Sequence, residues 1–346
     1  MKKLLVVLSL LASMVIPVRA ESLVAPEPPS QAMHFLPQEQ GSFSGDLWYL
    51  LCQAVEILEP EIASCFGICL SLIVVSLLMS VLNCFPGSSR AMTGLCGSVV
   101  IGCLMIASSA QMIQSASDTV RGISDYSKLL VPVLTAALAS QGGVSQSAAL
   151  YAGTAFFDTL LSSVIANALI PMVYIYVALS VAKSALGSDL LKRFQNLVKS
   201  STSWFLKLVL YIFTGYMTIT KVITGTADQT ALKATKLTIS GMVPVVGGIL
   251  SDASETVLIG AGIVKNSVGI AGLMAVLAIA IGPFLKIGIQ YVLLKMTGAV
   301  CGMIGDKRST DLIGDFSTAM GLILAMTGTV CLLQLISIVC FLMGAA

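Results

Sequence analysis

Apolar runs alternate with short polar stretches along most of this chain. A membrane-spanning helix needs about 20 predominantly apolar residues. Six runs are long enough: Ile62–Leu82, Gly94–Ile113, Leu160–Ala182, Trp204–Ile223, Val268–Leu294 and Phe316–Met343. The pattern therefore predicts an all-α, polytopic membrane protein with about six transmembrane helices.

Two further apolar stretches are too short to cross a bilayer. Leu129–Ala139 would extend only about 16 Å as a helix; it is followed by the polar stretch "SQGGVSQS" and a second short run, Ala148–Phe157. Met242–Leu250, "SDASE" and Thr256–Val264 have the same organisation. We predict two re-entrant helical hairpins that face the protein interior, because non-helical backbone at membrane depth needs polar partners there.

The two predicted hairpins belong to an internal repeat. A shift of 112 residues places "VPV" at 131–133 on "VPV" at 243–245, and also aligns Pro171 with Pro283 and Lys183 with Lys295. Each unit contains a hairpin, a Pro-containing span, a charged linker and a second span. We predict a two-helix transmembrane unit at 61–115, followed by parallel repeat units at 128–224 and 240–346.

The N-terminus has the pattern of a secretory signal. Lys2 and Lys3 precede a short apolar run that Pro17 ends, and Ala20 provides a small residue for cleavage. We predict a signal peptide at 1–20, with an uncleaved anchor as the alternative, and an exported, partly disordered segment at 21–60. Export of this segment places Arg90 and both basic linkers in the cytoplasm. The same orientation places Lys221, Lys233 and Lys236 on the exported side of the membrane. This is against the rule that lysine and arginine are enriched in cytoplasmic loops.

The amino-acid composition and the absence of known motifs exclude several classes of function. Hydrophobic residues make up 56% of the chain and charged residues 10%, against about 25% charged in soluble domains. The net charge of +2, with dispersed basic residues, does not indicate nucleic-acid binding. The nine cysteines form no CxxC pair, so neither a metal site nor a cofactor is indicated. No GxxxxGK[ST], HExxH or GxSxG motif is present, and we predict no enzyme activity.

Asp252 and Glu255 are candidate functional residues at the tip of the second predicted hairpin. Residues three apart share one helix face, so the two carboxylates could bind a cation or line a polar conduit. The alternative is a solvated turn in which Ser251 or Asp252 caps the next helix.

Lys286 and Asp158 are ionisable residues within or beside predicted spans. Lys286 follows Pro283 by three residues, and it could bond the backbone carbonyl that Pro283 leaves free or pair with Asp252 or Glu255. Snorkelling or packing in an oligomer interface is the alternative. Asp158 lies at the foot of the first hairpin. The predicted helix breaks are Pro132, Pro171, Pro244 and Pro283.

Several stretches resemble one known family. The exported leader, "VPVVGGILSDASETV", "VGIAGLMAVLAIAIGPFLKIG" and "GDKRSTDLIGDF" are similar to stage III sporulation protein AE of endospore-forming bacteria. The resemblance runs from about Ser44 to the C-terminus and includes the leader. The exported segment is shorter here than is usual for the family, which leaves any partner contact of that segment open.

The resemblance implies a place in a secretion-like complex. Such a subunit would lie in the mother-cell membrane around the forespore, with other membrane subunits and a separate secretion-type ATPase as partners. It would form part of a channel or export platform, or act as its permease-like component. The alternatives are an autonomous secondary transporter of a small solute and a membrane scaffold. Homo-oligomerisation stays open.

Overall fold

The computed structural model describes residues 25–29, 33, 43–83, 90–242, 247–304 and 307–344. The side chains of residues 43, 44, 51, 57–60, 90, 91, 221–265 and 304 are outside this description. The predicted signal peptide and most of the predicted exported segment lie outside the described residues. Within them the chain is all-helical: α3 (Phe43–Asn83), α4 (Arg90–Ser140), α5 (Val144–Val164), a π-helical turn η1 (Ile165–Leu169), α6 (Ile170–Leu186), α7 (Asp189–Met242), α8 (Gly247–Ile304) and α9 (Lys307–Leu342).

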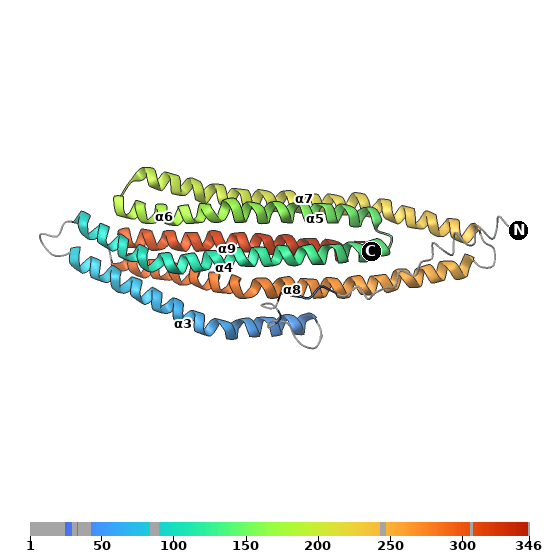
Figure 1. Ribbon diagram of the computed structural model, residues 1–346, viewed down its shortest axis with the longest axis horizontal. Helices are drawn as coiled ribbons and strands as arrows, with labels where there is room; N and C mark the ends of the chain where they lie inside the picture. Colours follow the sequence, from blue (N-terminus) through green and yellow to red (C-terminus); the bar gives the residue numbers. More distant parts are fainter. Residues whose placement is uncertain are drawn as a thin grey trace.

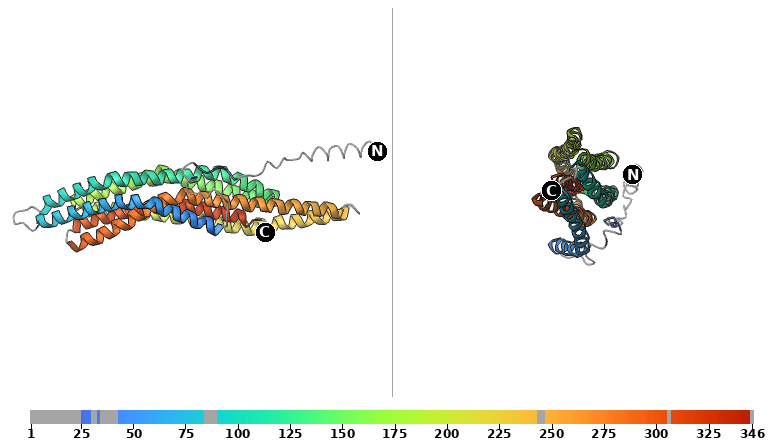
Figure 2. Two further views of the ribbon diagram at one scale, coloured as in Figure 1. Left: turned by 90° about the horizontal axis from the view of Figure 1, so that it is seen from below. Right: turned by 90° about the vertical axis from the view of Figure 1, so that its left-hand side faces the viewer.

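The helices run nearly parallel in one elongated bundle (Figure 1). α9 lies in the middle and packs against α4, α5, α6, α7 and α8. It carries no charged residue after Asp315, and its central side chains are buried from Phe316 to Phe341. α3 lies at one edge of the bundle, against α8 and α4 (Figure 2).

The first predicted hairpin is not a separate element. Its first leg, 129–139, is the end of α4, a 51-residue helix about 76 Å long. The helix continues through the polar stretch 114–128 because polar and buried positions alternate there with helical spacing. One face buries Ala116, Val120, Ile123 and Leu130, while the other exposes Gln114, Asp118, Arg121, Asp125 and Lys128. Pro132 lies inside this helix without ending it.

The second leg of that hairpin, 148–157, continues into the predicted span at 160–182. Together they form a rod from Val144 to Leu186 that is interrupted only by the π-helical turn at Ile165–Leu169. Pro171 follows this turn near the start of α6. Proline has no N–H to donate and its ring crowds the preceding turn, and a π-helical turn is a common accommodation of such a local fault. Between α4 and α5 the chain reverses sharply at residues 141–143, where Gly142 has a positive φ of 91°.

The structure also differs from the prediction at the second predicted hairpin. Pro244 lies in 243–246, outside the described residues. The predicted break at 251–255 is wrong, because α8 begins at Gly247 and runs without interruption to Ile304 over 58 residues, about 87 Å. In the first unit the chain reverses after Ser140, which aligns with Asp252 inside α8. The two units are therefore not in register at this point, and the repeat of two hairpins is not confirmed.

Five helical segments among the described residues are long and apolar enough to cross a membrane: Glu61–Asn83, Met92–Ser140, Val144–Leu186, Asn266–Met303 and Lys307–Leu342. The predicted span at 204–223 lies in α7, which is not one of them. The ends of α3, α6 and α8 and the starts of α4, α7 and α9 lie at the left-hand end of the bundle in Figure 1. The cytoplasmic linkers predicted from their basic residues are at this end.

Candidate functional site

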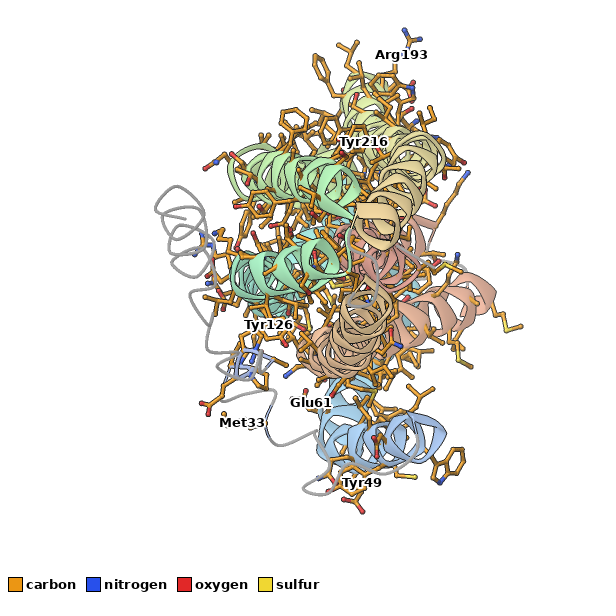
Figure 3. The ribbon with its side chains drawn as sticks, turned by 90° about the vertical axis from the view of Figure 1, so that its right-hand side faces the viewer. Met33, Tyr49, Glu61, Tyr126, Arg193 and Tyr216 are labelled. Atoms are coloured by element: carbon orange, nitrogen blue, oxygen red, sulfur yellow. The ribbon has the colours of Figure 1, made fainter. Side chains whose placement is uncertain are left out.

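Lys286 and Glu61 form an ion pair that joins α8 to the edge helix α3. Their side chains are 24% and 33% exposed, so both charges are partly withdrawn from the surroundings. Figure 3 shows Glu61 at the boundary between α3 and the rest of the bundle. Since a charge within an apolar span needs a partner, this pair explains how Lys286 is tolerated there.

Two kinds of partner were predicted for Lys286: the backbone carbonyl that Pro283 leaves free, or the carboxylate of Asp252 or Glu255. The pairing with Asp252 or Glu255 is wrong. All three residues lie on the same uninterrupted helix, which separates Lys286 from Glu255 by about 46 Å along the axis. A straight helix cannot bring these side chains together. The side chains of Asp252 and Glu255 lie outside the described residues, and only their position in the first turns of α8 is given.

A groove between α4 and α8 lies beside this ion pair. It has a volume of about 540 Å³. Its α4 wall is polar and consists of Gln111, Gln114, Ser115, Asp118 and Thr119, and its α8 wall includes Ile279, Gly282, Pro283 and Lys286. We name it the α4–α8 groove.

Two features add polar groups to the α4–α8 groove. The side-chain amide of Gln114 donates to the Asp118 carboxylate at 3.2 Å. Pro283 has no N–H for the carbonyl of Ile279 one turn earlier, so the helix backbone contributes an additional acceptor to this wall. Next to the groove, Gln290 donates to Ser108 Oγ at 2.6 Å, which continues the polar contact between the two helices.

A second polar group is buried between α4, α5 and α9. Three side-chain pairs connect the three helices: Ser124 with Asp158 at 2.8 Å, Ser127 with Gln334 at 2.9 Å, and Thr154 with Ser337 at 2.5 Å. All six residues are at most 3% exposed. We name them the buried polar cluster. The structure thus places Asp158 inside the bundle rather than at a membrane surface.

The basic end of the bundle is tied together by Lys183. Its ammonium forms an ion pair with Asp315 of α9 and donates to Gln195 Oε1 of α7 at 2.9 Å. Gln195 in turn donates to Ser180 Oγ at 2.7 Å. The Lys183 and Asp315 side chains are only 15% and 17% exposed, so this network fixes α6, α7 and α9 to one another.

Comparison with known proteins gives the family. The sequence model for stage III sporulation protein AE matches residues 30–345, nearly the whole chain. The chain belongs to this family. It is 25% identical over 193 residues to stage III sporulation protein AE of Bacillus subtilis (strain 168); the alignment covers 56% of this chain and 48% of that protein. The match thus spans about half the length of that relative. No solved structure matches the chain.

Membership of this family, together with the five apolar helices, supports a membrane protein of sporulation. Sequence reasoning missed Glu61, Ser124, Asp315 and Gln334 as partners of ionisable or buried groups. Asp118 and Gln114 had a visible signal, since they stand four apart and form one polar stripe on α4 with Gln111.

Proposed function

We propose that this chain is a polytopic subunit of the channel or export platform in the secretion-like complex between mother cell and forespore. Its place in the mother-cell membrane and its partners, other membrane subunits and a separate secretion-type ATPase, are part of the proposal. Family membership supports the sporulation setting, and five apolar helices support insertion in a membrane.

The α4–α8 groove is the observation that carries a role in transport. It combines a polar wall on α4, a stretch of α8 that contains Pro283 without being broken by it, and the Glu61–Lys286 pair. Both helices contain candidate spans. Polar and charged groups at membrane depth usually face a bundle interior or a wet cavity rather than lipid. In an assembly, this groove would face neighbouring subunits or the conducting path.

The residues at one end of the bundle support a particular orientation of the chain in the membrane. Arg308 lies beside Gly94 and Gly187, which brings the starts of α4 and α9 and the α6–α7 turn together. Lys183, Lys192 and Arg308 line one hollow there together with Asp189 and Asp311, so basic residues exceed acidic ones by one. An excess of lysine and arginine is typical of the cytoplasmic side, so this end would face the mother-cell cytoplasm, where an ATPase could bind.

The test uses spore formation in an endospore-forming host that carries this gene. Lys286→Met, Glu61→Gln and Asp118→Asn should each lower the yield of heat-resistant spores at normal protein level in the membrane. Asp125→Asn is the matched control, because Asp125 is an exposed acid on the same helix outside the groove, with a side chain 71% exposed. Wild-type yields for all three groove variants would refute a conduit at this groove and favour a scaffold.

A second experiment separates a subunit from an autonomous transporter. The purified chain in liposomes should take up no small solute by itself, because the proposed path requires further subunits. Solute uptake by the chain alone that is lost in Lys286→Met would overturn the platform proposal and establish a secondary transporter.

A further inference from the structure

Asp158 is the ionisable residue of the buried polar cluster. Among the described residues, no positively charged side chain pairs with it. It is 3% exposed. Its Oδ2 atom contacts Ser124 Oγ at 2.8 Å, while its Oδ1 atom is buried without a hydrogen-bond partner. Ionised, it would be a buried carboxylate with a single neutral donor, which is among the most unfavourable arrangements in a protein interior.

The charged groups around Asp158 do not change this. On α4, Asp125 and Lys128 act on it from a distance, but they pair with each other at the surface, and Arg121 is exposed. α5 has no other charged residue, and α9 has none after Asp315. α7 packs on α5 through Phe213 and Tyr216, which contact Phe157, and its Lys207 is exposed.

A neutral acid fits the local hydrogen bonds. Ser124 Oγ lies 3.3 Å from Ser162 Oγ, and Ser162 Oγ donates to the backbone carbonyl of Asp158 at 2.6 Å. With a proton on Oδ2, Asp158 donates to Ser124, Ser124 donates to Ser162, and Ser162 donates to the carbonyl of residue 158. Every hydroxyl hydrogen in this series then has an acceptor.

We propose that Asp158 is a proton-binding site, which holds one proton on Oδ2 through the Ser124–Ser162 relay at the junction of α4, α5 and α9. The ligand is a proton rather than a metal ion, because the side-chain oxygens of the Ser127–Gln334 and Thr154–Ser337 pairs already take part in hydrogen bonds with each other. Few oxygens are left to coordinate a metal ion. The proposal does not rest on the transport role.

Infrared spectroscopy of the purified full chain in detergent at pH 7 tests this directly. The wild type should show the carbonyl band of a protonated carboxylic acid, which Asp158→Asn removes and Asp125→Asn keeps. Ser124→Ala should shift this band, because it removes the acceptor of the acid proton. A wild-type spectrum with carboxylate bands only, or a carbonyl band that survives in Asp158→Asn, would refute the proton site.

Thermal unfolding is the independent measurement. Asn has the shape of a neutral carboxylic acid and can donate to Ser124, so Asp158→Asn should unfold within about 2 °C of the wild type. Replacement of choline chloride by sodium chloride should change the unfolding temperature of neither the wild type nor Asp158→Asn. A sodium-dependent stabilisation that Asp158→Asn abolishes, or a drop of about 10 °C or more in that variant, would show that the ionised form is the native one.

Discussion

Lys286 on α8 and Glu61 on α3 form an ion pair although 225 residues separate them in sequence. The contact fixes the edge helix to the bundle at the end of the α4–α8 groove. α3 packs mainly against α8 and α4, and a second polar contact also fixes its register: Thr93 Oγ1 of α4 donates to Asn83 Oδ1 of α3 at 2.6 Å.

Breaking this pair should destabilise the bundle by a moderate amount. Lys286→Met or Glu61→Gln alone leaves one partly buried charge without its partner, and each should cost about 1–3 kcal/mol. The double variant should cost less than the sum of the two. Circular dichroism during thermal unfolding in detergent measures this, and strictly additive losses would show that the two charges do not interact.

The Lys183–Asp315 pair should matter more, because it is more deeply buried and Lys183 also bonds Gln195. We expect Lys183→Met to cost about 3 kcal/mol or more. The matched control is Lys128→Met, which removes an ion pair whose side chains are 62% and 71% exposed. Its loss should stay below about 1 kcal/mol. Equal losses in the two variants would contradict the structural role of the buried pair.

Gly153 allows α5 and α7 to approach closely. A Cβ atom there would overlap the ring of Tyr216, and Tyr216 cannot easily move because its hydroxyl donates to the Ala149 carbonyl at 3.0 Å. Gly153→Ala should therefore destabilise the protein by about 1–3 kcal/mol.

Gly215 is the matched control for Gly153. It lies on α7, where a Cβ would meet nothing within 4 Å. Gly215→Ala should be neutral or stabilise the helix by up to about 1 kcal/mol. A loss in Gly215→Ala comparable to that in Gly153→Ala would mean that helix propensity, not the approach to Tyr216, controls both results.

Thiol labelling should locate the membrane boundary along α4. Cys103 is exposed in the uncharged half of this helix, and Asp125 is exposed in its charged half. The test uses chains with a single cysteine, expressed in non-sporulating cells so that the exported side faces the medium. A membrane-impermeant maleimide added to these cells should react with Asp125→Cys and leave Cys103 unmodified. Labelling at 103 but not at 125 would contradict the proposed orientation.

The all-helical fold was accessible from the sequence, because long apolar runs and helical periodicity depend on local residues. The positions at which the helices begin and end could not be predicted from the sequence. At 114–128 the polar residues suggested a boundary, yet Ala116, Val120 and Ile123 continue the buried stripe and carry α4 through. At 251–255, "SDASE" had the composition of a turn, but it lies in the first turns of α8.

The partners of the candidate residues could not be predicted either. Lys286 and Asp158 were recognisable as rare ionisable groups in apolar surroundings, but their partners Glu61 and Ser124 come from other helices. Such contacts are determined by how the helices pack, and helical periodicity does not encode which face of α3 or α4 meets α8 or α5.

The uninterrupted length of α8 has a mechanical consequence. At about 87 Å, a rod that turns by about 5° around one end displaces the other by roughly 8 Å. A slight change of inclination within the bilayer would thus be amplified into a large movement of the distal tip.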